Sequence, residues 1–212
     1  MFFVASGFAT VITVNNPSFE TLPATGLPIG CGADCFFSES DSGIPGWEIA
    51  PGSVVRTGQF QPGTQDGNLT FFNSLSEGIT SAYTNGGTIF QTVLPAVQDG
   101  QIYTLTVDLG HRNDIPSFDS SADLLVGGPG GQVFMATGTP PPLGGWSTFT
   151  ARFVGTDANE GEPITIQLIG SPPQGNFDNV SLTSVPVPEP SSMLLLGSGV
   201  LGLAQVIRRK LM

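Results

Sequence analysis

Hydrophobic and polar residues alternate with a period of two in several stretches of the chain. Tyr103, Leu105, Val107 and Leu109 fall on one side of such a stretch, with threonine and aspartate between them. Residues 148–153 and 164–168 repeat the pattern, which predicts half-buried antiparallel strands. Further strands are expected at residues 69–73, 88–93, 122–126, 132–136 and 177–183.

Turn signals rich in Gly and Pro separate these stretches, and none before residue 191 has helical periodicity. The composition agrees, because 29 Gly and 18 Pro accompany only 11% charged residues. Eight or more strands in about 170 residues predict an all-β fold, an antiparallel β-sandwich over residues 14–184. A single C-terminal hydrophobic helix is expected after it.

The end of the chain has a different pattern. A stiff Pro-rich linker covers residues 185–190, and residues 191–207 are uncharged. At 1.5 Å per residue this span is near the minimum for a bilayer-crossing helix. The basic residues that follow would stay in the cytoplasm, and they are Arg208, Arg209 and Lys210. Residues 191–212 therefore predict a membrane anchor with the domain outside; the alternative is a buried core helix.

This tail resembles the PEP-CTERM sorting signal, in which a Pro-Glu-Pro motif precedes a short hydrophobic helix and an Arg-rich end. The matching motif is Pro188, Glu189 and Pro190, followed by the span from Ser191 and the three basic residues. The resemblance implies a Gram-negative bacterium, where an exosortase in the inner membrane processes the tail. The protein would then reach the cell surface or the extracellular space.

The first 13 residues are apolar, with small residues toward their end. They predict the remnant of a signal peptide that is cleaved near Ala9 or Thr10, although its basic region is missing. Either the start codon lies further upstream, or this segment is a first strand and export uses another route.

Charge excludes one class of partner. All 17 acidic residues lie before residue 191, where the only basic residues are Arg56, Arg112 and Arg152, so this part has a formal charge of −14. Such a surface repels phosphate backbones, which argues against nucleic-acid binding. It is compatible with cation binding, or with solubility alone outside the cell.

Two cysteines, Cys31 and Cys35, lie four positions apart in a Gly-rich segment. In an exported chain the pair predicts a small disulfide loop. A metal site would need two more soft ligands, and a redox pair normally has two intervening residues and a following helix.

Short motifs within the domain resemble the galactose-binding-like jelly rolls of carbohydrate-binding modules. They are Asn15–Glu20, Gly46–Trp47, the segments beginning at Phe90 and Gln101, and Phe177–Leu182. The resemblance implies a jelly roll and a structural calcium ion held by Glu20 and Asp178. The alternative is that both carboxylates only accept hydrogen bonds from turn amides.

Sugar-binding modules stack exposed aromatic rings on sugar faces. Trp47 and Trp146 are therefore candidate ligand contacts, with core packing as the alternative for each. Tyr83, Phe72 and Phe118 are weaker candidates. The polar loop that follows the central strand is the best candidate contact, with a solvated turn as its alternative, and consists of His111, Arg112, Asn113 and Asp114.

Catalytic signatures are absent from the sequence: it has one His, no nucleophile elbow, and no phosphate-binding loop before a helix. We therefore expect a non-enzymatic surface or matrix protein that binds extracellular polysaccharide and requires no cofactor besides the calcium ion. The alternatives are a secreted glycan hydrolase and a structural coat protein without a ligand.

Overall fold

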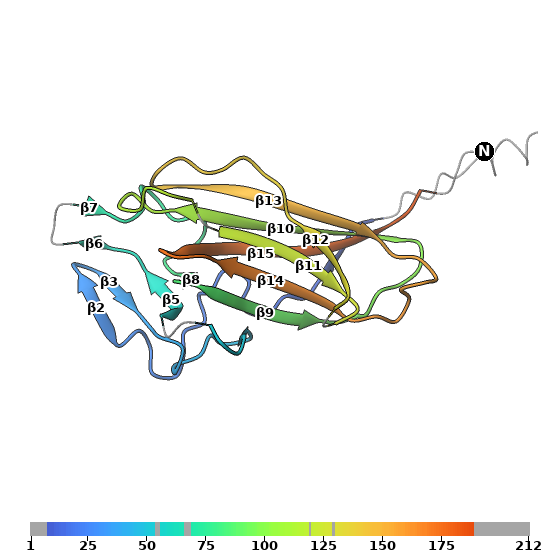
Figure 1. The fold of residues 1–212 in the computed structure, drawn as a ribbon, viewed down its shortest axis with the longest axis horizontal. Coiled ribbons are helices and arrows are strands. Elements are labelled where there is room, and N and C mark those ends of the chain that lie inside the picture. The colour runs from blue at the N-terminus through green and yellow to red at the C-terminus, as the bar shows by residue number, and fades with distance from the viewer. Residues whose placement is uncertain (1–7, 54–55, 66–68, 119, 129, 189–212) are drawn as a thin grey trace, which may run out of the picture.

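The protein is a sandwich of two antiparallel sheets in a computed structural model that describes residues 8–188, apart from 54–55, 66–68, 119 and 129 (Figure 1). The larger sheet has the order β13 (Gly145–Val154), β10 (Gln101–His111), β15 (Gly175–Pro186), β8 (Ser81–Thr84), β5 (Thr57–Gln61), β3 (Cys35–Phe37) and β2 (Ile29–Gly32). Its eighth strand, β1 (Thr10–Ile12), pairs with β15.

The smaller sheet has five strands, in the order β12 (Gln132–Met135), β11 (Ser120–Val126), β14 (Ile164–Gly170), β9 (Gly87–Val93) and β4 (Glu48–Ile49). A two-stranded ribbon of β6 (Thr64–Gln65) and β7 (Leu69–Thr70) lies beside the end that carries β2 and β3 (Figure 1). The predicted all-β sandwich is confirmed.

The main core lies between the two sheets and follows the period-two pattern. On β10, Leu105, Val107 and Leu109 are completely buried, and they belong to the same cluster as Ile166 and Leu168 of β14. Alternation arises because one face of each strand meets the opposite sheet while the other is more accessible. The long strands were predictable for this reason.

The strands β2 to β5 and β8 were not predicted. They are two to five residues long, and the first four residues of β5 and all of β8 are buried, polar residues included, so polarity does not mark an outer face. A second aromatic cluster covers this part of the larger sheet and includes Phe60, Phe71, Phe72 and Tyr83. The predicted Cys31–Cys35 disulfide joins β2 to β3.

The two chain ends leave the sandwich close together (Figure 1). Residues 10–12 pair with Leu182–Ser184 of β15 as a first strand. A signal peptide ending near Ala9 or Thr10 stays a prediction, since residues 1–7 lie outside the described part. The described chain ends at Pro188, so Glu189, Pro190 and the expected helix with its basic end lie beyond it. Within the described residues, no helix is long and apolar enough to span a membrane.

Trp47 packs in the core, and this generates a stability prediction. Its side chain is 6% exposed, its ring centroid lies 5.4 Å from that of Phe19, and its Nε1–H donates to the carbonyl of Asn16. We expect Trp47→Ala to lower the free energy of unfolding by about 3–5 kcal/mol, because it leaves a large cavity.

Urea denaturation measures this change. Leu94→Ala is the control, since Leu94 is 81% exposed and its truncation should change the free energy of unfolding by about 0.5 kcal/mol or less. A loss of under about 1 kcal/mol for Trp47→Ala would show that the ring is not part of the core.

Candidate functional site

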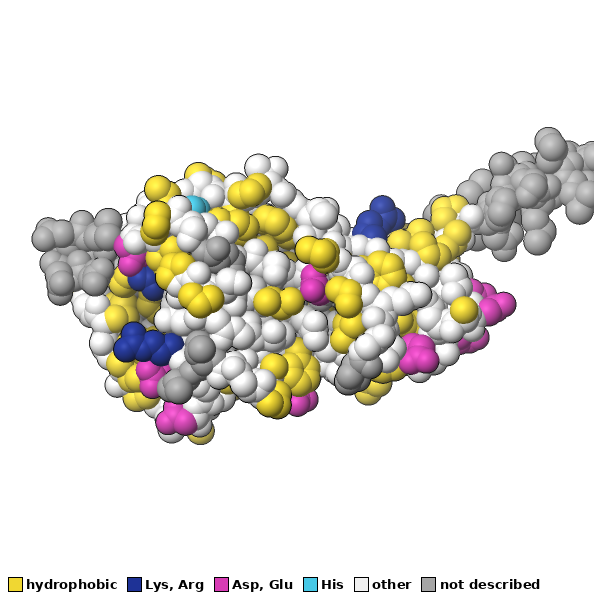
Figure 2. Space-filling model, in the orientation of Figure 1, with side chains coloured by type: hydrophobic (Ala, Val, Ile, Leu, Met, Phe, Trp, Pro, Cys, Tyr) yellow, Lys and Arg dark blue, Asp and Glu magenta, His cyan; other side chains and the backbone are white. Residues whose placement is uncertain are grey.

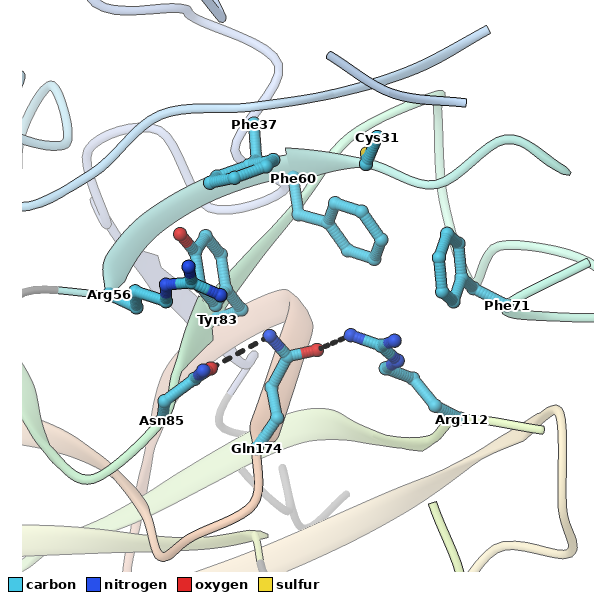
Figure 3. A pocket seen from close by; sticks show the side chains of 9 residues that line it. All are labelled: Cys31, Phe37, Arg56, Phe60, Phe71, Tyr83, Asn85, Arg112 and Gln174. Carbon is cyan, nitrogen blue, oxygen red and sulfur yellow. Dashed lines mark hydrogen bonds between the residues drawn. The ribbon is translucent and has the colours of Figure 1, made fainter. Parts of the chain in front are cut away.

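A hollow of about 230 Å³ opens at the end of the larger sheet that carries β2, β3 and β5 (Figure 3). Aromatic rings form much of its wall, and polar and basic side chains form the rest. The lining residues are Cys31, Phe37, Arg56, Phe60, Phe71, Tyr83, Asn85, Arg112 and Gln174.

Three polar side chains of the hollow lie just beyond strand ends. Asn85 follows β8, Gln174 precedes β15 and Arg112 follows β10. Because β15 is antiparallel to both neighbours, these three ends meet at one edge of the sheet. Gln174 donates to the Asn85 Oδ1 atom at 2.9 Å and accepts from the Arg112 Nη1 atom at 2.5 Å. The result is a chain of hydrogen bonds along the floor of the hollow (Figure 3).

Arg112 is held on two further sides. Its Nε and Nη2 atoms donate to the two carboxylate oxygens of Asp114, at 2.8 and 2.5 Å. The guanidinium carbon lies 4.2 Å from the ring centroid of Phe71 and 5.6 Å from that of Phe60. Such bidentate pairing and cation–π contact fix the plane of a guanidinium. One N–H on each terminal nitrogen remains for a ligand.

The aromatic wall is a set of edge-to-face contacts. The ring of Phe60 lies 5.4 Å from Phe71 and 6.0 Å from Tyr83, and Phe37 lies 6.1 Å from Tyr83 between centroids. Tyr83 donates its hydroxyl hydrogen to the Ser38 carbonyl at 2.7 Å, and burial raises the pKa of Tyr83 above its usual range. Tyr83 is therefore a neutral, fixed part of the wall.

Arg56 lies across the hollow from Arg112, beside Tyr83 (Figure 3). Its side chain is 66% exposed, and its Nε atom is 3.7 Å from a carboxylate oxygen of Glu39. Its carbonyl accepts from the backbone N–H of Asn85, which ties its backbone to the end of β8. Because its ion pair is long and exposed, the guanidinium can turn to a ligand at little cost.

The structure brings only one residue of the predicted polar loop into the hollow. Arg112 lines it and Asp114 supports Arg112, whereas the His111 ring contacts the carbonyls of Pro141 and Ile115. Asn113 bridges to the segment after β7 by donating to the Thr70 carbonyl and the Asn73 side chain. His111 and Asn113 thus hold loops together and do not line the hollow.

Neither tryptophan lines the hollow. Trp47 lies in the core, and Trp146 stacks on Phe72 with 4.7 Å between ring centroids while its Nε1–H donates to the Ser74 carbonyl. Of the weaker aromatic candidates, Tyr83 lines the hollow, and Phe118 packs against His111 and Phe149 outside it. Both tryptophans fit the packing alternative.

Glu20 and Asp178 converge on one segment, residues 77–80. The Glu20 Oε1 atom accepts from the backbone N–H groups of Ile79 and Thr80, and the Asp178 Oδ2 atom accepts from that of Glu77. Asp178 is completely buried, and burial raises its pKa to about 7, although two backbone hydrogen bonds oppose the shift. Both carboxylates thus bind turn amides, the alternative reading of these residues.

Within the described residues, no three side chains of His, Cys, Asp or Glu are grouped so that they could hold a metal ion. A calcium ion held by Glu20 and Asp178 would therefore take its other ligands from uncharged oxygens, such as backbone carbonyls and water. Both carboxylates carry oxygens, the ligand type that calcium prefers, and they reach the same turn.

Most of the lining could not be found from the sequence. Phe37, Phe60 and Gln174 lie outside the predicted strands, and the pairing of distant strands places the first two beside each other. One signal was present, because Arg56 and Arg112 are two of only three basic residues before residue 191.

The arrangement suits a flat, mainly apolar ligand that carries a hydrogen-bond acceptor. Rings supply the contact area, and guanidinium and amide N–H groups supply directed donors. None of the described lining residues is a carboxylic acid, histidine, lysine or free thiol. The groups that are present can bind, orient and polarise a ligand.

Residues 10–183 match the HpiC1-like family, described as HpiC1 cyclase, and residues 186–210 match the PEP-CTERM protein-sorting motif. The predicted sorting signal is confirmed, and the chain is an exported protein with a sorting tail. No curated protein sequence matches the chain.

Several solved structures are similar. The Stig cyclase Fisc from Fischerella sp. TAU, in complex with (3Z)-3-(1-methyl-2-pyrrolidinylidene)-3H-indole, is 23% identical, covers 84% of this chain and 99% of its own, and has a TM-score of 0.66. A cyclase from Fischerella sp. TAU in complex with 4-(1H-indol-3-yl)butan-2-one is 22% identical, with coverage of 84% and 98% and a TM-score of 0.62.

A carbohydrate-binding module is also among the similar structures. The CBM22-1 xylan-binding domain of Paenibacillus barcinonensis Xyn10C is 12% identical, covers 86% of this chain and 99% of its own, and has a TM-score of 0.48.

The family match overturns one prediction, that the chain is not an enzyme. That expectation rested on the absence of contiguous catalytic signatures, whereas the nine lining residues of this hollow are spread between positions 31 and 174 of the chain. Since the match covers most of the chain, from the first strand to the last, the protein belongs to the HpiC1-like family of cyclases.

Proposed function

We propose that this chain is an exported cyclase-type enzyme that binds a small unsaturated substrate in the hollow between Phe37, Phe71 and Arg112. The observation that carries the proposal is the aromatic hollow itself, on a chain that belongs to a family of cyclases. The Fischerella cyclase structures support the choice of indoles as probes, because their bound molecules contain an indole ring system.

Ring closure joins two atoms of one molecule, so the enzyme must hold that molecule folded with the reacting atoms close together. The rings of Phe37, Phe60 and Phe71 would enclose the apolar part of the substrate. Arg112, fixed by Asp114 and Gln174, would hold an acceptor atom at a constant position and polarise it. Residues that are already hydrogen-bonded need little reorganisation when the substrate enters.

Extracellular polysaccharide is the second candidate ligand. Asn85, Gln174 and Arg112 present planar polar groups beside aromatic rings, and this combination also recognises sugars. Retention on a glycan array that depends on these residues would favour the polysaccharide. The protein would then be a glycan-active enzyme.

Two neighbouring phenylalanines test the site directly. Phe37 lines the hollow, whereas Phe36, next to it on β3, is 40% exposed and does not. We expect Phe37→Ala to weaken binding of 4-(1H-indol-3-yl)butan-2-one by about tenfold, the loss of one ring contact, and Phe36→Ala to leave it unchanged. Isothermal titration calorimetry measures both affinities.

Activity is measured in parallel with indoles that carry an unsaturated side chain as substrates. Cyclisation gives an isomer of unchanged mass and altered chromatographic retention, and Phe37→Ala should form less of it than Phe36→Ala. Equal behaviour of the two variants in binding and in product formation would contradict the assignment of the hollow as the active site.

We also propose that Glu20 and Asp178 hold a structural calcium ion. Each accepts hydrogen bonds from the turn at residues 77–80. The turn therefore links the segment after β1, which carries Glu20, to β15, which carries Asp178. Two carboxylates linked through one turn are a partial set of calcium ligands. A bound ion would favour the ionised form of Asp178 and so oppose the effect of burial on its pKa.

This proposal predicts a pH-dependent effect of calcium. Burial raises the pKa of Asp178 in the folded protein, so without calcium its contribution to stability is lost as the pH rises from about 4 through 7. Calcium needs the ionised carboxylate and should therefore stabilise more at pH 8 than at pH 5. Near a hundredfold excess over Kd we expect the thermal midpoint at pH 8 to rise by about 5–10 °C.

Thermal melts with calcium chloride or with chelator at both pH values test this. Asp178→Asn should abolish the difference, and Asp157→Asn, an exposed control, should retain it. A midpoint that chelator leaves unchanged at pH 8 would remove the calcium ion from the account.

Finally, we propose that an exosortase recognises Pro188, Glu189 and Pro190 while the following apolar span is anchored in the inner membrane. The match at residues 186–210 and the order of motif, span and basic end support this. The processed domain would be released to the cell surface or the extracellular space of a Gram-negative bacterium.

A fusion of residues 185–212 to a secreted reporter tests the sorting proposal. In a host with an exosortase we expect the reporter to enter the membrane fraction and then to be cut, and Glu189→Ala to prevent the cut. A reporter that stays dissolved and uncut in that host would contradict it.

A further inference from the structure

The hollow and the charge of the molecule together point to the kind of substrate. We infer that the hollow selects a small planar anion, a carboxylate attached to an aromatic or unsaturated group, over its neutral or cationic analogues. This inference rests on the proposed function of the hollow and names the substrate class that it would accept.

The first observation is where the cations lie. Residues 1–190 contain 17 acidic residues but only the three arginines Arg56, Arg112 and Arg152, and two of these line the hollow. In Figure 2, basic side chains lie beside acidic ones at the end of the molecule near β2 and β3, and one further basic group lies on the upper edge, toward the other end. In a strongly acidic protein, such placement brings two of these three arginines to one hollow, which favours a negative charge there.

The second observation is which way the charges face. Glu39 and Asp114, the acidic partners of the two arginines, are not among the lining residues. Arg112 keeps two N–H donors beyond its bonds to Asp114 and Gln174, and Arg56 has one long contact to Glu39 at 3.7 Å. A ligand in the hollow therefore meets donors and cations, with no lining carboxylate that would repel its charge.

The third observation is the shape of the apolar wall. Phe37, Phe60, Phe71 and Tyr83 surround a volume of about 230 Å³, which suits a ligand of one or two fused rings. A site within a polysaccharide chain generally needs a groove that is open at both ends, because the polymer continues on either side of the bound sugars. The volume thus favours a small molecule over an acidic polymer.

Two isosteric probes separate charge from shape. The compound 4-(1H-indol-3-yl)butan-2-one carries a methyl ketone on a two-carbon chain, and 3-(1H-indol-3-yl)propanoate carries a carboxylate at the same position. We expect the full-length protein to bind the carboxylate about fivefold more tightly at low ionic strength, the effect of one charge-assisted hydrogen bond at a partly exposed site. Added salt should reduce the preference.

Arginine variants assign the preference to the hollow. Arg56→Gln should reduce the ratio of the two affinities to below about twofold, because it removes the charge that only the carboxylate uses. Arg152→Gln is the matched control, since it removes the same charge from an exposed position on β13 outside the hollow. Calorimetry with the wild-type protein and both variants gives the six affinities.

The outcomes distinguish the two levels of the account. If the wild-type protein binds neither probe, the proposed function of the hollow fails. If it binds the ketone as tightly as the carboxylate, only the selection of an anion is overturned. The same follows if Arg152→Gln removes the preference as fully as Arg56→Gln. Tighter binding of tri-galacturonate than of 3-(1H-indol-3-yl)propanoate, in competition for the same hollow, would overturn the small-molecule assignment.

Discussion

The pairing of β15 with β10 on one side and β8 on the other holds the candidate site together. Its antiparallel register sets Gly175 opposite Thr84 and Asn176 opposite Gly110. The residues just beyond these pairs therefore meet at the sheet end, where Gln174 connects Asn85 and Arg112. A shift of one residue would turn every side chain of the strand to the opposite face, so the buried core that fixes the register also fixes the site.

The sequence predicted the part of the fold that obeys a two-residue period. Strands β9 to β15, apart from their exact ends, are the stretches whose alternating faces meet a core and a more accessible surface. The strands that carry Phe60 and Tyr83 are buried on both faces, and the strand that carries Phe37 is only three residues long, so none of them shows a clear alternation. Much of the aromatic wall comes from such segments, which explains why Phe37 and Phe60 were not predicted, while Tyr83 and Arg112 were among the predicted contacts.

The same limit explains the wrong expectation that the chain is not an enzyme. Contiguous motifs report a catalytic site only where neighbouring residues share the chemistry. In this hollow, the polar groups are separated by tens of residues, and Arg112 contacts Phe60 and Phe71 from other strands or loops. Motif arguments worked at the tail, where the sorting signal is read as a linear segment.

A crystal structure of the protein with 4-(1H-indol-3-yl)butan-2-one would test most directly that the aromatic hollow is the substrate site. The account predicts the indole ring among Phe37, Phe60 and Phe71, with the ketone oxygen accepting from Arg112 or Arg56. Binding instead in the second hollow, which Val11 and Leu94 line near the chain ends, would contradict it.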